Sequence, residues 1–316
     1  MSTDTPYVRE DVRAFLTLLE QLGGKSVEEV GAVEGRKAMR ALGQIAEAAP
    51  LDLERIEYLT CPGPAGDIPI RLYDNRQGRG HSPCVLFIHG GGFVIGDLEV
   101  YHALCTEIVQ ALDLPVVSVD YRLAPEHPFP AAPDDCEAAA RWIASSPSEL
   151  GFDVTGLVIT GDSAGGNLTI VTTNQLVQDP AAVPVIVQAP IYPVASDVSQ
   201  HESLQHFAEG YFLTSAQMGW FTRQYGGEAS DERHTPLPGS RSGTPPTVVC
   251  TAGLDPLRDS GREYAAHLVQ QGTDVTYLEF PGIIHGFVTL RKAIPSGQAD
   301  LAAFLTAMKT MLERGQ

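Results

Sequence analysis

The chain has 316 residues, and 43% of them are hydrophobic, which is enough for one substantial core. Its 21 Lys and Arg residues are outnumbered by 39 Asp and Glu, so the formal net charge is −18. Such a surface repels nucleic acid and anionic membranes, and we expect neither as a partner. No stretch approaches the roughly 20 consecutive apolar residues of a membrane span, and the N-terminus lacks a secretory signal pattern. We therefore expect a cytoplasmic protein.

Five cysteines are scattered along the chain, and no two of them have CxxC spacing. This pattern argues against a metal site and against a disulfide framework. Cys84 and Cys250 lie in apolar, strand-like runs, where cysteine acts as a small hydrophobic residue. We therefore expect no bound metal.

Residues 1–50 are predicted to be helical. Apolar residues recur near helical spacing until Gly23 and Gly24 end the pattern: Val12, Phe15, Leu18, Leu19 and Leu22. A second helix is predicted from Val33 to Ala48. Neither helix carries a motif, so we expect both to pack against or cover the rest of the protein.

From about Ile56 onwards, short β-rich runs alternate with helical patterns. The predicted strands are 68–73, at a sheet edge, and 84–88, 116–119, 157–160, 185–187, 247–250 and 275–278. The predicted helices between and after them are 102–112, 132–145, 168–177, 261–271 and 299–312. Continuous apolar strands that alternate with helices indicate a mainly parallel sheet with both faces covered.

Residues 196–235 interrupt this alternation. They contain no convincing strand, but they carry six aromatic residues: Phe207, Tyr211, Phe212, Trp220, Phe221 and Tyr225. An aromatic insertion between two core strands is typical either of a lid over a site or of an ordinary pair of packed surface helices. The sequence alone does not separate these two interpretations.

The sequence Gly161-Asp-Ser-Ala-Gly165 follows a predicted buried strand and precedes a predicted helix. This is the G-x-S-x-G pattern in the strand–turn–helix context of a nucleophile elbow. Gly161 and Gly165 would let the strand and the helix approach closely. Ser163 would then present its hydroxyl at a helix N-terminus, where backbone N–H groups favour developing negative charge. We predict that Ser163 is a nucleophile.

A glycine-rich loop, His89-Gly90-Gly91-Gly92-Phe93, follows the predicted strand that ends at residue 88. An acyl-transfer enzyme needs N–H donors directed at a tetrahedral oxyanion, and glycines let the backbone turn those groups inward. We predict that these donors are the amides of Gly91, Gly92 and Ala164. His89 and Gly90 would support the loop. Neither G-x-G-x-x-G nor a Walker lysine is present, which argues against a phosphate-binding loop.

A serine hydroxyl needs a base, and His285 is the best placed of nine histidines. It lies in a loop after the predicted strand that ends near Glu279. An acid that orients this base is expected at the end of another strand, and Asp255 fits. Asp259 is the competing acid, but it falls where a helix begins and acids are common for capping reasons. The order Ser, Asp, His is that of α/β-hydrolases.

The sequence resembles the hormone-sensitive-lipase-like family of esterases, also called bacterial family IV. The resemblance covers residues 84–290 and rests on five motifs: HGGGF (89–93), DYRLAPEHPFPAA (120–132), GDSAGGN (161–167), DPLRD (255–259) and HGF (285–287). The pentapeptide GDSAG is similar to that of the subgroup named for it. Many relatives have an acid where Ser260 stands.

The resemblance implies an α/β-hydrolase fold with a helical cap and no cofactor. Residues 1–50 and 196–235 would form the cap, and residues 51–195 and 236–316 would form the core. The substrate would be a small-molecule ester with a short- to medium-chain acyl group. Members often form homodimers through the sheet edge. From its residues, the segment 121–128 is predicted only to be a proline-stiffened turn near the site, without a catalytic role for Glu126 or His127.

Two other functions use the same residues. A non-catalytic ligand binder on this scaffold would lose the histidine of the triad, whereas His285 is present. A relative acting on amides would use the same acyl chemistry, which the triad does not separate from ester hydrolysis, and a lyase would use the same pocket. A triglyceride lipase is less favoured, since no apolar patch for an oil interface is evident.

Overall fold

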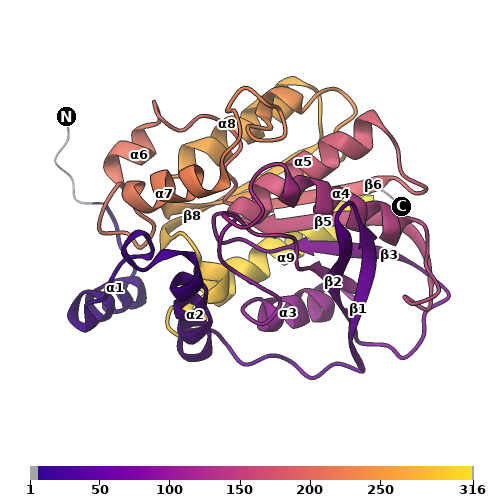
Figure 1. Cartoon of the computed structure of the whole chain (residues 1–316), viewed down its shortest axis with the longest axis horizontal. Coiled ribbons are helices and arrows are strands. Elements are labelled where there is room, and N and C mark those ends of the chain that lie inside the picture. Colours follow the sequence, from indigo (N-terminus) through magenta and orange to yellow (C-terminus); the bar gives the residue numbers. More distant parts are fainter. Residues whose placement is uncertain (1–5, 315–316) are drawn as a thin grey trace.

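The computed structural model describes residues 6–314. An eight-stranded sheet runs through the molecule in the order β1-β2-β4-β3-β5-β6-β7-β8, with helices on both faces (Figure 1). The parallel part consists of β3 (His81–Ile88), β4 (Val116–Val119), β5 (Asp153–Asp162), β6 (Val185–Ile191), β7 (Thr247–Leu254) and β8 (Val275–Ile284). The predicted mainly parallel sheet flanked by helices is therefore confirmed.

The two remaining strands, β1 (Arg55–Gly63) and β2 (Gly66–Asp74), are antiparallel. The prediction that residues 68–73 form an edge strand is wrong, because β2 pairs with β1 on one side and with β4 on the other. Pro69 lies one residue before the ladder with β4, which begins at Ile70. The edge strand on this side is β1, in which exposed residues alternate with half-buried ones and with the buried Cys61, so its sequence lacks the apolar run of a core strand.

Helices cover the sheet from both sides and bury its apolar residues. One core cluster joins the sheet to α3 (His102–Leu112) and α9 (Ser296–Arg314). A second cluster on the other face joins it to α4 (Ala131–Ala144) and α5 (Ala164–Gln178). α8 (Arg258–Gln270) packs beside α5 in a third, smaller cluster. Each large apolar side chain buried in this way contributes about 1.5–3 kcal/mol.

Two pairs of helices lie outside this arrangement. They are α1 (Glu10–Leu22) with α2 (Val27–Ala46), and α6 (Glu202–His206) with α7 (Ser215–Tyr225). In Figure 1 all four lie at one end of the molecule, away from β1 and β2. Two short 3-10 helices span Leu237–Gly239 and Phe287–Thr289.

The helix α2 begins six residues before the predicted start at Val33. Ser26 and Glu29 form a capping box, in which each side chain interacts with the backbone of the other, and this nucleates the earlier turn. Gly31, at φ 79°, kinks the helix just after that turn. The predicted start at Val33 lies just after this kink, so the sequence pattern identified only the part of the helix that follows it.

All five cysteines are buried and free, which agrees with the role as small hydrophobic residues predicted for Cys84 and Cys250. Burial raises the pKa of the Cys61 and Cys105 thiols to about 12. Within residues 6–314, no helix is long and apolar enough to cross a membrane.

Candidate active site

Ser163 stands in a sharp turn between β5 and α5. Its backbone has φ 55° and ψ −117°, a left-handed conformation that non-glycine residues seldom adopt. The turn fits because glycines flank it: a methyl group on Gly161 or on Gly165 would overlap the carbonyl oxygen of Ile88. The Ser163 N–H donates to the carbonyl of Ile191 on β6 at 2.9 Å. The G-x-S-x-G segment thus has the predicted strand–turn–helix geometry.

A continuous hydrogen-bonded chain leads from Ser163 to Asp255. Nε2 of His285 lies 2.8 Å from the Ser163 Oγ, and Nδ1 lies 2.7 Å from Oδ2 of Asp255. Asp255 is fully buried, and its other oxygen accepts the Leu257 N–H at 2.8 Å. The three residues follow β5, β7 and β8, whose carboxyl ends meet at one edge of the sheet.

Asp259, the competing acid, lies elsewhere. It stands in the first turn of α8, where its carboxylate pairs with Arg258 and Arg262 at 2.9 and 3.0 Å. It also accepts the backbone N–H of Ser203 at 2.9 Å. These contacts are those of an acid at a helix start, as expected, and Asp255 alone of the two contacts the histidine.

The glycine-rich loop passes beside Ser163. Gly91 and Gly92 have φ values of 114° and 60°, which L-residues with side chains rarely adopt. Within residues 6–314, the N–H groups of Gly91 and Gly92 donate to no acceptor of the protein. The Ala164 N–H opens α5, and first-turn amides have no intrahelical partner. The three amides predicted to bind an oxyanion therefore have free donor capacity next to Ser163.

His89 supports this loop from the buried side. Its Nδ1 lies 2.8 Å from the Gly90 carbonyl, and its ring stacks on Tyr121 with a centroid distance of 4.3 Å. The Tyr121 hydroxyl donates to the His89 carbonyl at 2.8 Å. His89 itself is fully buried, so it occupies the supporting position that the sequence predicted for it.

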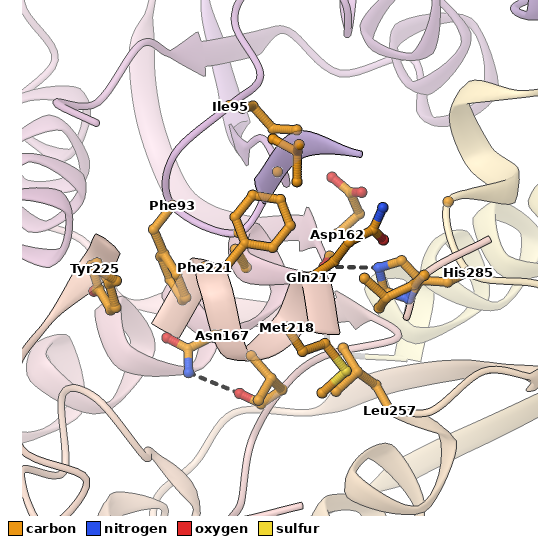
Figure 2. Close-up of a pocket in the computed structure, with 18 of the residues that line it drawn as sticks. Phe93, Ile95, Asp162, Asn167, Gln217, Met218, Phe221, Tyr225, Leu257 and His285 are labelled. Carbon is orange, nitrogen blue, oxygen red and sulfur yellow. Dashed lines mark hydrogen bonds between the residues drawn. The ribbon is translucent and has the colours of Figure 1, made fainter. Parts of the chain in front are cut away.

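A cavity of about 480 Å³ opens above Ser163. Figure 2 shows His285 on one side of this cavity and Phe93 and Tyr225 on the opposite side, with Phe221 and Met218 of α7 between them. Further walls come from α2, through Met39 and Leu42. The lining is mostly apolar, as is usual for a small-molecule site.

The helices around the cavity also hold the glycine-rich loop. The Phe93 ring stacks on Tyr225 with centroids 3.8 Å apart, and the Phe221 ring fills the space where a Gly92 side chain would lie. On α2, Nε of Arg36 donates to the Val94 carbonyl at 2.8 Å.

These supporting contacts were not predicted. Arg36 also forms an ion pair with Glu126 at 2.6 Å, which lowers the pKa of that carboxyl to about 2. An arginine on an amphipathic helix usually lies on the solvent-exposed face, so nothing in the sequence around Arg36 indicates that it contacts the glycine-rich loop. Tyr192, whose ring lies 4.4 Å from that of His285, was also missed for lack of a motif.

Within residues 6–314, no group of three or more His, Cys, Asp or Glu side chains is arranged to hold a metal ion. The site consists of hydroxyl, imidazole, carboxylate and amide groups. Together they can remove a proton from Ser163 and stabilise negative charge beside it.

Comparison with known proteins places this geometry in a family. Residues 85–289 match a family described by the alpha/beta hydrolase fold. The carboxylic ester hydrolase LipN of Mycobacterium tuberculosis is 37% identical over 293 residues, which cover 89% of this chain and 77% of that protein. The ethyl acetate hydrolase of Pseudomonas putida is 32% identical over 315 residues, which cover 96% of this chain and 98% of that protein.

Solved structures agree with these relatives. An ester hydrolase from the metagenome of Lake Arreo, in complex with a bipyridine phosphonate derivative, superposes with a TM-score of 0.90 at 35% identity, covering 96% of this chain and 98% of that chain. A thermostable esterase from Pseudomonas putida has a TM-score of 0.91 at 29% identity, covering 98% and 99%. The predicted α/β-hydrolase fold is thereby confirmed, and the chain belongs to the hormone-sensitive-lipase-like family of carboxylesterases.

Proposed function

We propose that this chain hydrolyses carboxylic esters with Ser163 as nucleophile, His285 as base and Asp255 as the acid that orients the base. The observation that supports this proposal is the pair of hydrogen bonds, 2.8 and 2.7 Å, that connects the serine to the buried carboxylate through the imidazole. Asp255 holds the imidazole in the tautomer whose Nε2 is free to accept the serine proton, and it stabilises the imidazolium that forms.

The reaction runs in two acyl transfers. The Ser163 Oγ bonds to the ester carbonyl carbon while its proton passes to Nε2 of His285. The resulting oxyanion accepts hydrogen bonds from the amides of Gly91, Gly92 and Ala164. When the C–O bond to the alcohol breaks, His285 returns the proton to the leaving oxygen. Water then attacks the acyl-enzyme with the same base and the same amides, which releases the acid and Ser163.

The proposed substrates are esters with short- to medium-chain acyl groups. The apolar cavity of about 480 Å³ supports this choice, since it has room for a modest acyl chain beside the serine. One relative is named for ethyl acetate. We further propose that residues 1–50, of which the structure describes 6–50, and residues 196–235 form a cap, because Met39 and Leu42 of α2 and Met218 and Phe221 of α7 wall the cavity.

Three accompanying properties stay predictions. Membership of the GDSAG subgroup rests on residues 161–165, and a cytoplasmic location and the lack of nucleic-acid binding rest on composition. A homodimer through the sheet edge is a further expectation, which rests on the resemblance to the family.

The substitution Ser163→Ala removes the nucleophile. Turnover of p-nitrophenyl butyrate is expected to fall by at least about 10⁴-fold, because no other group can form the acyl-enzyme. The release of p-nitrophenol and the thermal melting of both proteins are measured. Ser145→Ala, at an exposed serine after α4, is the control and keeps wild-type turnover. Near-normal activity of a folded Ser163→Ala protein would contradict the assignment.

The two candidate acids can be separated by matched substitutions. Asp255→Asn is expected to lower kcat by about 10⁴-fold, because an amide that donates to Nδ1 favours the wrong imidazole tautomer. Asp259→Asn loses only contacts with two arginines and a backbone N–H, so kcat should stay within about threefold of wild type, as for most changes away from the reacting groups. The opposite ranking of the two variants would assign the role to Asp259.

A series of p-nitrophenyl esters from acetate to palmitate measures the depth of the acyl site. Each added methylene that enters the cavity contributes about 0.8 kcal/mol, so kcat/KM should rise from acetate to a maximum between butyrate and octanoate. Beyond the cavity the chain gains no burial, and palmitate should be cleaved at least about tenfold less well than the best ester. Spontaneous hydrolysis of each ester is subtracted. A maximum at palmitate would refute the short-chain assignment.

A further inference from the structure

The proposed mechanism makes no use of Asp162, the residue immediately before the nucleophile. Its side chain is buried, with a residue exposure of 3%. Burial of a carboxylate is costly unless other groups stabilise its charge. Within residues 6–314, no lysine or arginine forms an ion pair with Asp162. Its stabilisation must therefore come from hydrogen bonds and from the site around it.

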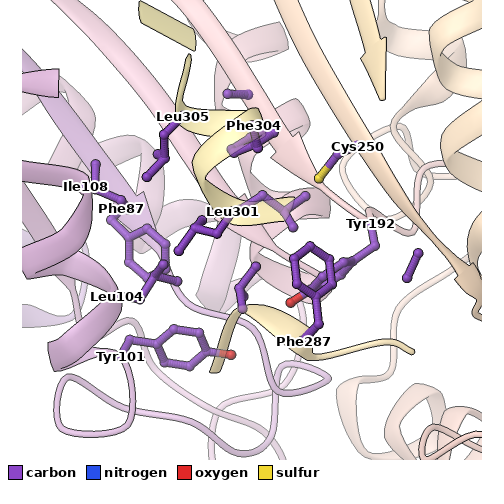
Figure 3. Packing of buried hydrophobic residues seen from close by; sticks show 14 of the residues in the cluster. Phe87, Tyr101, Leu104, Ile108, Tyr192, Cys250, Phe287, Leu301, Phe304 and Leu305 are labelled. Atoms are coloured by element: carbon purple, nitrogen blue, oxygen red, sulfur yellow. The ribbon is translucent and has the colours of Figure 1, made fainter. Parts of the chain in front are cut away.

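Three donors converge on this carboxylate. The Gly90 N–H donates to Oδ1 at 2.8 Å, and the hydroxyls of Tyr101 and Tyr192 donate to Oδ2 at 3.1 and 3.3 Å. Figure 3 shows the hydroxyls of Tyr101 and Tyr192 directed toward the same region from opposite sides. Two of these donors adjoin the groups proposed to carry the reaction. Gly90 precedes the two glycines whose amides would bind the oxyanion, and the ring of Tyr192 packs against that of His285.

We propose that Asp162 is a positioning residue of the esterase reaction: it anchors the oxyanion loop through Gly90, holds Tyr192 against His285, and favours the imidazolium with its charge. This inference rests on the proposed function of Ser163 and His285. The same buried carboxylate would thus support both the amides that bind the oxyanion and the histidine that acts as the base.

The anchoring of the loop follows from the contact at Gly90. A methyl group added there would lie 2.6 Å from Oδ2 of Asp162, so the loop backbone rests directly on the carboxylate. The next two residues supply the amides that would bind the oxyanion. Because donors to an oxyanion act over a narrow range of distance and angle, loss of the Gly90 anchor should weaken transition-state binding more than substrate binding.

The effect on the base follows from charge. Asp162 faces His285, His89, Tyr101 and Tyr192, and burial raises its pKa while the nearby His285 and the Gly90 N–H oppose that rise. His285 in turn faces Asp255, Asp162 and Tyr192. A second negative charge near the imidazole, without direct contact, would stabilise the imidazolium that forms when Ser163 gives up its proton. Removal of that charge should slow the reaction and make the resting imidazole harder to protonate.

Asp162→Asn tests both effects because it keeps the shape and an acceptor for Gly90 but removes the charge. With p-nitrophenyl butyrate, kcat should fall by about 10- to 100-fold while KM changes by less than about threefold. The acid limb of the kcat/KM profile should move to lower pH, because loss of a nearby negative charge disfavours the imidazolium. Asp162→Ala, which also leaves the Gly90 N–H without its acceptor, should lose more in kcat.

Asp300→Asn is the matched control. Asp300, on α9, is also a buried carboxylate whose pKa is raised by burial, but it lies outside the site and pairs with Arg9, the residue before α1. This variant should lose stability and keep the wild-type kcat and pH profile. If Asp162→Asn behaved in the same way, Asp162 would be merely structural and the inference would be overturned.

Tyr192→Phe gives a second test that does not depend on the folding of an Asp162 variant. It keeps the ring against His285 and removes only the hydroxyl that donates to Asp162. We expect kcat to fall by about three- to tenfold, the effect of one lost hydrogen bond, with KM unchanged. Unaltered kcat in this variant would also overturn the inference. An inactive wild-type protein would instead refute the proposed function itself.

Discussion

The site depends on one backbone conformation, that of Ser163. A left-handed residue between β5 and α5 is possible here because Gly161 and Gly165 let the turn press against the end of β3. The same turn places the hydroxyl beside His285, puts the Ala164 N–H at the start of a helix, and sets Asp162 beneath the glycine-rich loop. The proposed nucleophile, one proposed oxyanion donor and the support of the loop are thus fixed together by a single strained residue.

The glycine-rich loop, residues 89–93, is held from two sides. On the core side, Asp162 and His89 contact Gly90. On the side of the proposed cap, Phe93 stacks on Tyr225, and Arg36 binds the carbonyl of Val94. The helices that wall the acyl cavity therefore also constrain the loop that would bind the oxyanion. A change in the cap that reshapes the cavity is expected to affect turnover as well as substrate affinity.

The sequence alone identified those candidate residues that lie beside a recognisable local pattern. Ser163, Asp255 and His285 each follow an apolar strand, and parallel strands bring their carboxyl ends to one edge, so their convergence could be predicted. Interactions between distant segments could not be predicted in this way. The strand β1 was missed because Arg55, Glu57 and Thr60 interrupt its apolar residues, and 68–73 was consequently placed at the edge. Arg36 and Tyr192 carry no local signal, since only the folded chain brings them to Val94 and His285.

Covalent labelling with a phosphonate measures directly whether Ser163 reacts as a nucleophile. A p-nitrophenyl alkylphosphonate should react with Ser163 Oγ, release p-nitrophenol and leave a phosphonyl group that mimics the tetrahedral intermediate. We expect one adduct per chain, located by mass spectrometry on the peptide that contains Ser163, and a loss of esterase activity in proportion to labelling. An adduct on another residue, or loss of activity while Ser163 stays unmodified, would contradict this expectation.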